Sequence, residues 1–311
     1  MLDALSKSFF HALARSKSLE RMASRYGMAS PNAFGRRFIA GEDVDEAITA
    51  ARAIQALGMA LTLDQLGESI TTLAEADTAT LGYIALIEKI VAAGIDRNIS
   101  IKLTQLGLDI DTGVCTNNVK RIFDLARQHG FFVRVDMENT PYIQKTLDLF
   151  TAVWAQGYQH AGVVLQSAVL RSEDDARAMC KLGVRVRLVK GAYKEPPALA
   201  HQAKAEVDAA YVRIMKTLLT EGVYPAIATH DPAMIEATKA FAAEKSIPKD
   251  KYEFQMLYGI RRDLQAALVR DGYRMRVYVP FGKQWFPYFM RRLGERPANV
   301  GFVLKGIFGE R

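Results

Sequence analysis

Strand-like and helix-like segments alternate along most of this chain of 311 residues, and that alternation limits the fold more than any other feature. Short runs rich in β-branched and aromatic residues recur between longer segments with helical periodicity. The strand candidates are 59–64, 99–104, 131–136, 162–166, 184–189, 225–229, 252–255 and 274–279. Eight such βα units predict a closed (βα)8 barrel of the TIM type. We expect the barrel to span residues 59–311 and residues 1–58 to supply extra N-terminal helices.

Two of the turns carry signals for the start of a helix. Asp231 followed by Pro232 is typical of an N-cap and the first helical position. Ser172 and Asp175 have the spacing of a capping box, in which two side chains satisfy backbone N–H groups reciprocally. Both signals therefore predict helices that follow strands of the barrel.

The composition is that of a globular protein with an excess of positive charge. Hydrophobic residues make up 50% of the chain, charged residues make up 24%, and the formal net charge is +7. This charge suits an anionic substrate, an acidic lipid surface or nucleic acid. The basic residues are spread out without a dense Lys/Arg block, so nucleic acid is the weakest of these partners. No apolar run approaches the roughly 18 residues that a membrane span needs.

Residues 1–27 are basic and amphipathic, with only Asp3 and Glu20 acidic. They lack the continuous apolar core of a signal peptide. A helix packed on the domain is the favoured interpretation, and a membrane-surface helix or an organellar transit peptide are the alternatives. Cys115 and Cys180 lie far apart and in no CxxC motif, so the sequence predicts neither a disulfide framework nor a metal site. We expect a cytoplasmic protein.

Polar side chains close nearly every predicted strand. In a parallel barrel the C-terminal strand ends meet at one mouth, where active sites lie. The residues at these ends are Asp64, Lys102, Asp136, Gln166, Arg187 with Lys190, Thr229 with His230, Gln255 and Tyr278. A purely structural barrel does not need so many polar strand ends, so the pattern favours an enzyme.

Lys102 lies among apolar residues, where a lysine needs an ionic partner or a function. An ion pair with Asp136 inside the barrel and a role in substrate binding are both open. Asp136 itself can cap a loop, neutralise a cation or act as an acid–base group. Farther along, Arg187 and Lys190 lie on opposite faces of one strand, and Gly191 permits close approach of a ligand to the backbone.

The stretch 274–297 combines a strand, a break and a helix. Tyr278 lies near the end of the strand, and Pro280 and Gly282 are expected to end it. A helix is predicted from Trp285 onward, carrying the adjacent Arg291 and Arg292 and then Glu295. An isolated pair of this kind is usually a solvated basic face with an ion pair to the acid three or four positions on. The alternative is a site for one small anion.

Several motifs occur in one order between about Leu61 and Pro297: SIKLTQLGLD, VRLVKGAYKEP, ATHD, YEFQMLYGIRR and the C-terminal stretch just described. Together they resemble the flavin-dependent proline dehydrogenases. The resemblance implies a (βα)8 barrel with a C-terminal helix that carries substrate-binding arginines. It also implies the monofunctional bacterial form, because no aldehyde dehydrogenase sequence follows.

The resemblance assigns roles to individual residues. The residues that it implies are catalytic are Asp136 and Arg187. Those implied in substrate binding are Lys102, Tyr193, Leu257, Tyr278, Tyr288, Arg291 and Arg292. Those implied in FAD binding are Met137, Gln166, Arg187, Lys190, Gly191, Ala192, Thr229 and His230. Glu295 is expected to pair with one of the two helical arginines, and Tyr278 is the side chain that goes with proline rather than hydroxyproline.

The implied reaction is oxidation of L-proline to 1-pyrroline-5-carboxylate, by hydride transfer from the ring carbon beside nitrogen to flavin N5. It is the first step of proline catabolism to glutamate. Electrons would then pass to a membrane quinone, which would explain a peripheral contact of the basic surface with the cytoplasmic membrane. No GxGxxG follows a strand, so any dinucleotide is bound without a Rossmann unit.

Two other classes of function stay open on the residues alone. A Schiff-base aldolase-type barrel would use Lys102 or Lys190 as its nucleophilic amine. A non-enzymatic barrel would act as a basic membrane-docking module. The first alternative predicts a lysine that can lose its proton, whereas the second predicts tolerance of substitution at Asp136 and Arg292.

Overall fold

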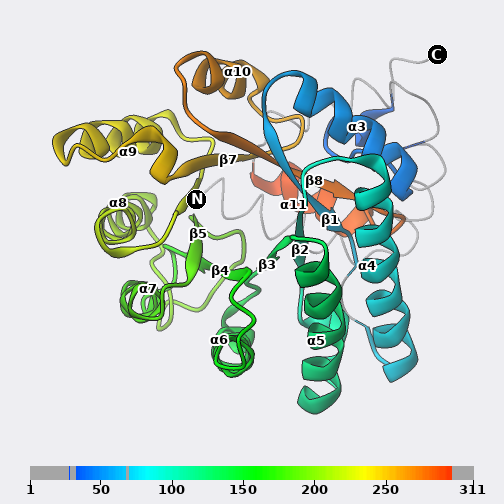
Figure 1. Cartoon of the computed structure of the whole chain (residues 1–311). Coiled ribbons are helices and arrows are strands. Elements are labelled where there is room, and N and C mark those ends of the chain that lie inside the picture. Colours follow the sequence, from blue (N-terminus) through cyan, green and yellow to red (C-terminus); the bar gives the residue numbers. More distant parts are fainter. Residues whose placement is uncertain (1–27, 29–32, 68–69, 296–311) are drawn as a thin grey trace.

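Eight parallel strands form a closed barrel in the computed structural model, in the order β1 to β8 (Figure 1). The structure describes residues 28, 33–67 and 70–295. The strands are β1 (Ala60–Gln65), β2 (Asn98–Ile101), β3 (Phe132–Val135), β4 (Ala161–Gln166), β5 (Arg185–Val189), β6 (Ala226–Ala228), β7 (Glu253–Leu257) and β8 (Met275–Phe281). Each pairs with the next in sequence, and β8 pairs with β1 to close the barrel. The predicted (βα)8 fold is confirmed.

The helices surround this barrel, as Figure 1 shows. They are α3 (Val44–Ala56), α4 (Leu73–Ala93), α5 (Thr112–Gln128), α6 (Thr140–Trp154), α7 (Ser172–Lys181), α8 (Lys204–Glu221), α9 (Pro232–Glu244), α10 (Arg262–Arg270) and α11 (Phe286–Glu295). Short 3-10 turns occur at η1 (Phe34–Arg37), η2 (Thr104–Leu106) and η3 (Lys249–Lys251). Helices α4 to α10 each connect two successive strands.

The outer and inner faces of the strands differ in chemistry. Leu61, Leu63 and Ile99 are fully buried in the apolar core, which lies between the strands and the helices. Because side chains alternate along a strand, the residues between them point into the barrel. Buried polar residues occupy these positions on several strands: Asp64, Ser100, Arg134, Arg187, Glu253, Gln255 and Arg276. The interior is thus polar, whereas branched apolar residues fill most barrels of this type.

Two helices depart from the regular repeat. Helix α3 precedes β1 and packs on both β1 and β8, the place that a helix after β8 would take in a regular barrel. Helix α11, which does follow β8, belongs to a second apolar cluster with Leu66 after β1 and Ile260 after β7. Both of these residues follow the C-terminal ends of strands, so α11 lies at the mouth of the barrel.

The first residues of some elements differ from the prediction. Asp231 is the N-cap of α9, as expected, and its carboxylate accepts from the Ala233 N–H. The prediction of a capping box at Ser172 is wrong, because the Ser172 hydroxyl donates instead to the backbone carbonyl oxygen of Gln166. Asp175 is engaged by Arg171, the residue at the N-cap of α7.

Strand β8 continues through Pro280, contrary to the prediction that this proline ends it. A neighbouring bond of the ladder comes from the Leu66 N–H to the Phe281 carbonyl oxygen at 2.7 Å, so it does not require the missing N–H of proline. The break comes at Gly282, whose φ of 125° lies in the region that favours glycine. Strand β2 is shorter than predicted and ends before Lys102.

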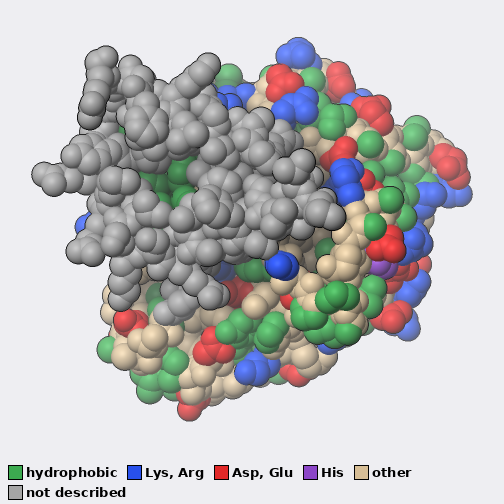
Figure 2. Space-filling view, turned by 180° about the vertical axis from the view of Figure 1, so that it is seen from behind, with side chains coloured by type: hydrophobic (Ala, Val, Ile, Leu, Met, Phe, Trp, Pro, Cys, Tyr) green, Lys and Arg blue, Asp and Glu red, His purple; other side chains and the backbone are tan. Residues whose placement is uncertain are grey.

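Figure 2 shows acidic and basic side chains interspersed over the described part of one face of the molecule. Among the helices that the structure describes, none is long and apolar enough to cross a membrane.

Candidate active site

Five charged or hydroxyl-bearing residues form a cluster at the C-terminal ends of β1, β2, β3, β5 and β8. We call it the mouth cluster, and its members are Asp64, Lys102, Asp136, Arg187 and Tyr278. The Lys102 ammonium donates to both carboxylate oxygens of Asp64, at 2.8 and 2.9 Å. It lies 4.0 Å from the nearer oxygen of Asp136. The closest partner of Lys102 is thus Asp64, and the expected ion pair with Asp136 is present at the longer distance.

The pairing of neighbouring strands explains why Asp64 is the closer of the two partners. The register of β1 and β2 places Asp64 opposite Ser100, two positions before Lys102. The next inward-facing residue of β2 therefore lies beside the end of β1. Spacing along the sequence predicts which residues face inward, but it does not give the register between two strands.

Asp136 lies at the centre of the other half of the cluster. One of its oxygens accepts from Arg187 NH1 at 2.7 Å, and the other accepts from the Tyr278 hydroxyl at 2.9 Å. The Arg187 guanidinium also lies over the Tyr278 ring, 5.3 Å from its centroid. The side chains of Arg187 and Asp136 are 5% and 13% exposed. Such a buried pair is held in one geometry, because its alternatives leave a charge without a partner.

The ionisation of the cluster follows from these contacts. Burial alone lowers the pKa of Lys102, but the carboxylates of Asp64 and Asp136 outweigh it and raise the pKa above the ordinary value. Lys102 is therefore an ammonium ion at any working pH. Burial raises the pKa of the Tyr278 hydroxyl, and nearby Asp136 raises it further. Tyr278 is therefore neutral and donates a proton to its hydrogen bond.

The ends of β4, β5 and β6 carry the residues predicted to bind a cofactor. The Gln166 amide donates to the carbonyl oxygen of Glu138 at 2.7 Å. Gly191 has a φ of 109°, and a Cβ there would lie 3.1 Å from the side-chain oxygen Oε1 of Gln166. Thr229 is buried, and its hydroxyl accepts from the Asp231 N–H. His230 Nε2 accepts from the Leu257 N–H at 2.9 Å, which ties the ends of β6 and β7 together.

Lys190 is held by two acids. It pairs with Asp208 on α8 and, at 2.6 Å, with Asp231 at the start of α9. Its side chain is 26% exposed. Burial raises the pKa of Asp231, but Lys190 outweighs this and the net pKa lies below the ordinary value. Lys190 thus fixes the positions of two helices beside the mouth.

The remaining predicted residues divide into those near the mouth and those whose side chains are not described. Met137 is buried directly after Asp136, and Ala192 and Tyr193 are half-buried in the loop after β5. Tyr288 of α11 belongs to the same apolar cluster that Tyr278 contacts. Arg291 and Arg292 are half-buried, and the Arg292 guanidinium lies 5.1 Å from the Tyr288 ring centroid. The side chain of Glu295 lies outside the described part of the chain.

Sequence reasoning assigned no site role to two residues that bond directly to the mouth cluster. Ser100 Oγ accepts from Arg187 NH2 at 3.2 Å, and Gln255 Oε1 accepts from Arg187 Nε at 2.6 Å. Gln255 was recognisable as a polar strand end. Ser100 gave no such signal, because a small hydroxyl residue within a strand is common.

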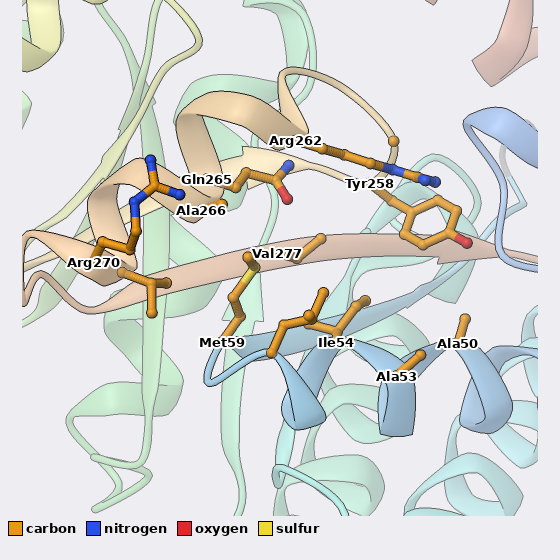
Figure 3. Close-up of a pocket in the computed structure, with 13 residues that line it drawn as sticks. Ala50, Ala53, Ile54, Met59, Tyr258, Arg262, Gln265, Ala266, Arg270 and Val277 are labelled. Atoms are coloured by element: carbon orange, nitrogen blue, oxygen red, sulfur yellow. The ribbon is translucent and has the colours of Figure 1, made fainter.

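A separate cavity of about 390 Å³ lies outside the barrel, between α3 and α10 (Figure 3). Met59 and Val277 form part of its floor, and Arg262 and Arg270 extend from α10 at its edge. No residue of the mouth cluster lines it. The cavity is thus distinct from the candidate active site.

Comparisons with known proteins agree with the geometry. Residues 47–305 match the family described as "Proline dehydrogenase". "Proline dehydrogenase 2" of Bacillus subtilis (strain 168) is 41% identical over 303 residues, which is 97% of this chain and 99% of that protein. "Proline dehydrogenase" of Deinococcus radiodurans is 40% identical over 311 residues and 99% of each chain.

Among solved structures, proline utilization A (PutA) from Bdellovibrio bacteriovorus, described as inactivated by N-propargylglycine, superposes with a TM-score of 0.80 at 28% identity. The match covers 89% of this chain and 34% of that one. The present chain thus spans about a third of that longer protein.

Proposed function

The chain belongs to the proline dehydrogenase family, and we propose that it oxidises L-proline to 1-pyrroline-5-carboxylate with FAD as its bound cofactor. The observation that supports this most directly is the mouth cluster, in which Asp136 joins Arg187 and Tyr278 beside the Asp64–Lys102 pair. This reaction is the first step of proline catabolism.

The cations at the mouth suit the carboxylate of proline. Arg291 and Arg292 lie on the helix that packs at the mouth, and Lys102 lies at the end of β2. Hydrogen bonds to charged groups contribute about 1.5–3 kcal/mol each. We propose that these three cations hold the carboxylate, while Tyr193, Leu257, Tyr278 and Tyr288 line the ring.

The residues at the ends of β3 to β6 fit a flavin. At Gly191 the φ of 109° favours glycine, and a Cβ there would lie 3.1 Å from Gln166 Oε1, which supports a close approach of this backbone to a flat ring. We propose that Met137, Gln166, Arg187, Lys190, Gly191, Ala192, Thr229 and His230 contact the cofactor. When bound, FAD supplies the two-electron oxidation by accepting a hydride from the substrate.

The chain supplies position and charge for this step. Asp136 holds Arg187 and Tyr278, and both of its oxygens are already engaged by those two side chains. We therefore assign Asp136 to orienting the cluster rather than to removing the amine proton. Arg187 presents a fixed positive charge beside the reacting ring, where it favours transfer of negative charge to the cofactor.

We further propose that the electrons pass to a membrane quinone and that the protein works on the cytoplasmic side of that membrane. The formal net charge of +7 favours contact with an acidic lipid surface. Sedimentation with anionic liposomes at low salt, and release at high salt, is the expected result. Equal sedimentation with neutral and anionic liposomes would contradict it.

The aldolase alternative is disfavoured by both candidate lysines. A Schiff-base lysine must reach its neutral form, which a lowered pKa makes possible. Lys102 has a raised pKa and pairs with Asp64, and Lys190 pairs with two acids. Borohydride treatment in the presence of small aldehydes and ketones is therefore expected to leave the mass of both lysine-containing peptides unchanged.

Steady-state turnover with an artificial quinone tests the proposed function. We expect L-proline to be oxidised, and the product to be trapped by an aromatic amino aldehyde that reacts with cyclic imines. Arg292→Met should raise KM strongly because it removes a carboxylate contact, whereas Arg213→Met, on the outer surface of α8, should not. Oxidation of another cyclic amine, without any oxidation of L-proline, would contradict the assignment.

A further inference from the structure

A second group of charges, two of them buried, lies at the opposite end of the barrel from the mouth. We call Asp96, Glu253 and Arg276 the lower charge group. Arg276 Nε donates to Glu253 Oε1 at 2.8 Å, and its NH1 donates to Asp96 Oδ2 at 2.7 Å. Glu253 is the first residue of β7, and Asp96 precedes β2, so the group lies at the N-terminal ends of strands. Glu253 and Arg276 are 3% and 6% exposed.

Gln255 connects this group to the mouth cluster. Its Nε2 donates to Glu253 Oε1 at 2.5 Å, and its Oε1 accepts from Arg187 Nε at 2.6 Å. Gln255 is itself only 3% exposed. One amide therefore bonds to a member of each group and lies between them inside the barrel.

The charge of Glu253 determines which way this amide faces. Burial raises the pKa of Glu253, but Arg276 outweighs it and the net pKa lies below its ordinary value. An ionised carboxylate only accepts hydrogen bonds, so the NH2 end of Gln255 must face Glu253. Its carbonyl oxygen then has to face Arg187. The reversed amide would set acceptor against acceptor at one end and donor against donor at the other.

Arg187 is consequently held by acceptors on three strands. Gln255 on β7 accepts a hydrogen bond from Arg187 Nε. Ser100 on β2 accepts one from NH2, and Asp136 after β3 accepts one from NH1. A guanidinium is planar and has five N–H groups, so three contacts fix its plane.

We propose that Gln255 is a positioning residue for the reaction, which acts by fixing the guanidinium plane of Arg187 at the mouth. This inference rests on the proposed function, because it requires Arg187 to lie beside the reacting ring. Without Gln255, the guanidinium can rotate about its contact with Asp136. Its charge would then be displaced from the reacting atoms, while the carboxylate contacts on α11 would be unchanged.

The test compares FAD-loaded wild type with Gln255→Leu, which keeps the approximate volume but removes both hydrogen bonds. We expect kcat for L-proline to fall roughly ten- to a hundredfold, with KM little changed, because misplacing a reacting group by about 1 Å costs this much. The midpoint potential of the bound FAD should become more negative. The dissociation constant of cyclopentanecarboxylate, which has no nitrogen to oxidise, should stay within about twofold.

Asn118→Leu is the matched control. Asn118 is buried on α5 outside the barrel, and its amide donates to the Leu106 carbonyl oxygen at 3.1 Å. The control should lower the melting temperature but leave the FAD potential and kcat unchanged. If Gln255→Leu behaves in the same way as this control, its role is structural and the inference is overturned.

Gln255→Met provides a second variant in case Gln255→Leu does not fold. Its unbranched side chain fills a similar volume, and its thioether is only a weak acceptor for Arg187. A lowered kcat and a more negative FAD potential, with KM little changed, would support the inference, and unchanged values would overturn it. A wild-type protein that binds FAD but does not oxidise proline would instead remove the proposed function, and this inference with it.

Discussion

At the scale of single residues, Asp136 has the most connected position in the mouth cluster. Replacing it with alanine removes the ionic partner of the buried Arg187 and the acceptor of the Tyr278 hydroxyl together. Breaking a buried pair by removing one member costs about 3–5 kcal/mol. We therefore expect Asp136→Ala to lower the free energy of unfolding by this order and to reduce kcat/KM at least a hundredfold.

Asp136→Asn is the control for charge at nearly constant shape, and it should retain the bond from Tyr278. The measurements are chemical denaturation and turnover with an artificial quinone. An alanine variant with wild-type turnover would show that Asp136 does not organise the site.

Glu253 gives a prediction for stability against pH. Its folded-state pKa lies below the ordinary value of 4.5, so the unfolded chain binds the proton first as the pH falls. Its contribution is therefore fully present above about pH 4.5 and is lost as the pH falls through the folded pKa. The difference in unfolding free energy between wild type and Glu253→Gln should shrink between pH 6 and pH 3. A difference that stays constant over this range would contradict the ion pair with Arg276.

The sequence predicted the members of the mouth cluster better than it predicted their contacts. A polar residue at an inward-facing position of a strand end lies at the mouth, so Asp64, Asp136 and Tyr278 could be identified from their places in the strands. The closer partner of Lys102, Asp64, could not, because this contact depends on the register between β1 and β2. Gln255 could be seen as a strand end. Its role, however, depends on its contact with Arg187, which lies far away in the sequence and on another strand.

At the scale of elements, Glu195 fastens the loop after β5 to helix α6. The N-cap of α6, Asn139, makes no side-chain cap. The Glu195 carboxylate instead accepts from the Thr140 N–H at 2.9 Å and from its hydroxyl at 2.6 Å. A carboxylate at a helix N-terminus is also favoured by the helix dipole. This contact holds the loop that carries Gly191 and Tyr193.

We expect Glu195→Ala to lower the free energy of unfolding by about 1–3 kcal/mol, since it leaves two donors of Thr140 without their acceptor. It should also weaken FAD binding and raise KM for proline, because the loop is released. Glu206→Ala, which alters an exposed acid at the start of α8, should leave FAD binding and KM for proline unchanged. Equilibrium dialysis with FAD and steady-state kinetics are the measurements. Unaltered FAD affinity in Glu195→Ala would contradict the role of this contact.

The elements themselves were largely predictable. Each of the eight strands was expected within a few residues of its observed place, because β-branched runs and glycine breaks are local signals. The continuation of β8 through Pro280 was missed. A strand tolerates a proline where the ladder needs no hydrogen bond from the N–H of that residue, and the sequence does not show which positions these are. The placement of α3 on β1 and β8 was also missed, because no local pattern shows where a preceding helix packs.

At the scale of the whole molecule, α3 completes the barrel on its outer side. Ala51 is fully buried on the face of α3 that packs on the strands. The division of the chain at residue 58 remains a proposal, and these contacts favour folding of α3 together with the barrel. An unpaired buried charge is among the few single changes that cost more than about 4 kcal/mol.

Ala51→Glu should therefore unfold the barrel at a much lower denaturant concentration, in a single transition with loss of bound FAD. Thr49→Glu, on the exposed face of the same helix, should have little effect. Loss of helical signal without any loss of FAD would show that α3 is independent of the barrel.

The central proposal is that the mouth cluster and the residues around it bind FAD and reduce it with L-proline. The most direct measurement is the visible spectrum of the purified protein during an anaerobic titration with L-proline. We predict an oxidised-flavin spectrum that bleaches with proline and persists with D-proline and cyclopentanecarboxylate. A protein that takes up no FAD, or a bound flavin that stays oxidised at saturating L-proline, would contradict the proposal.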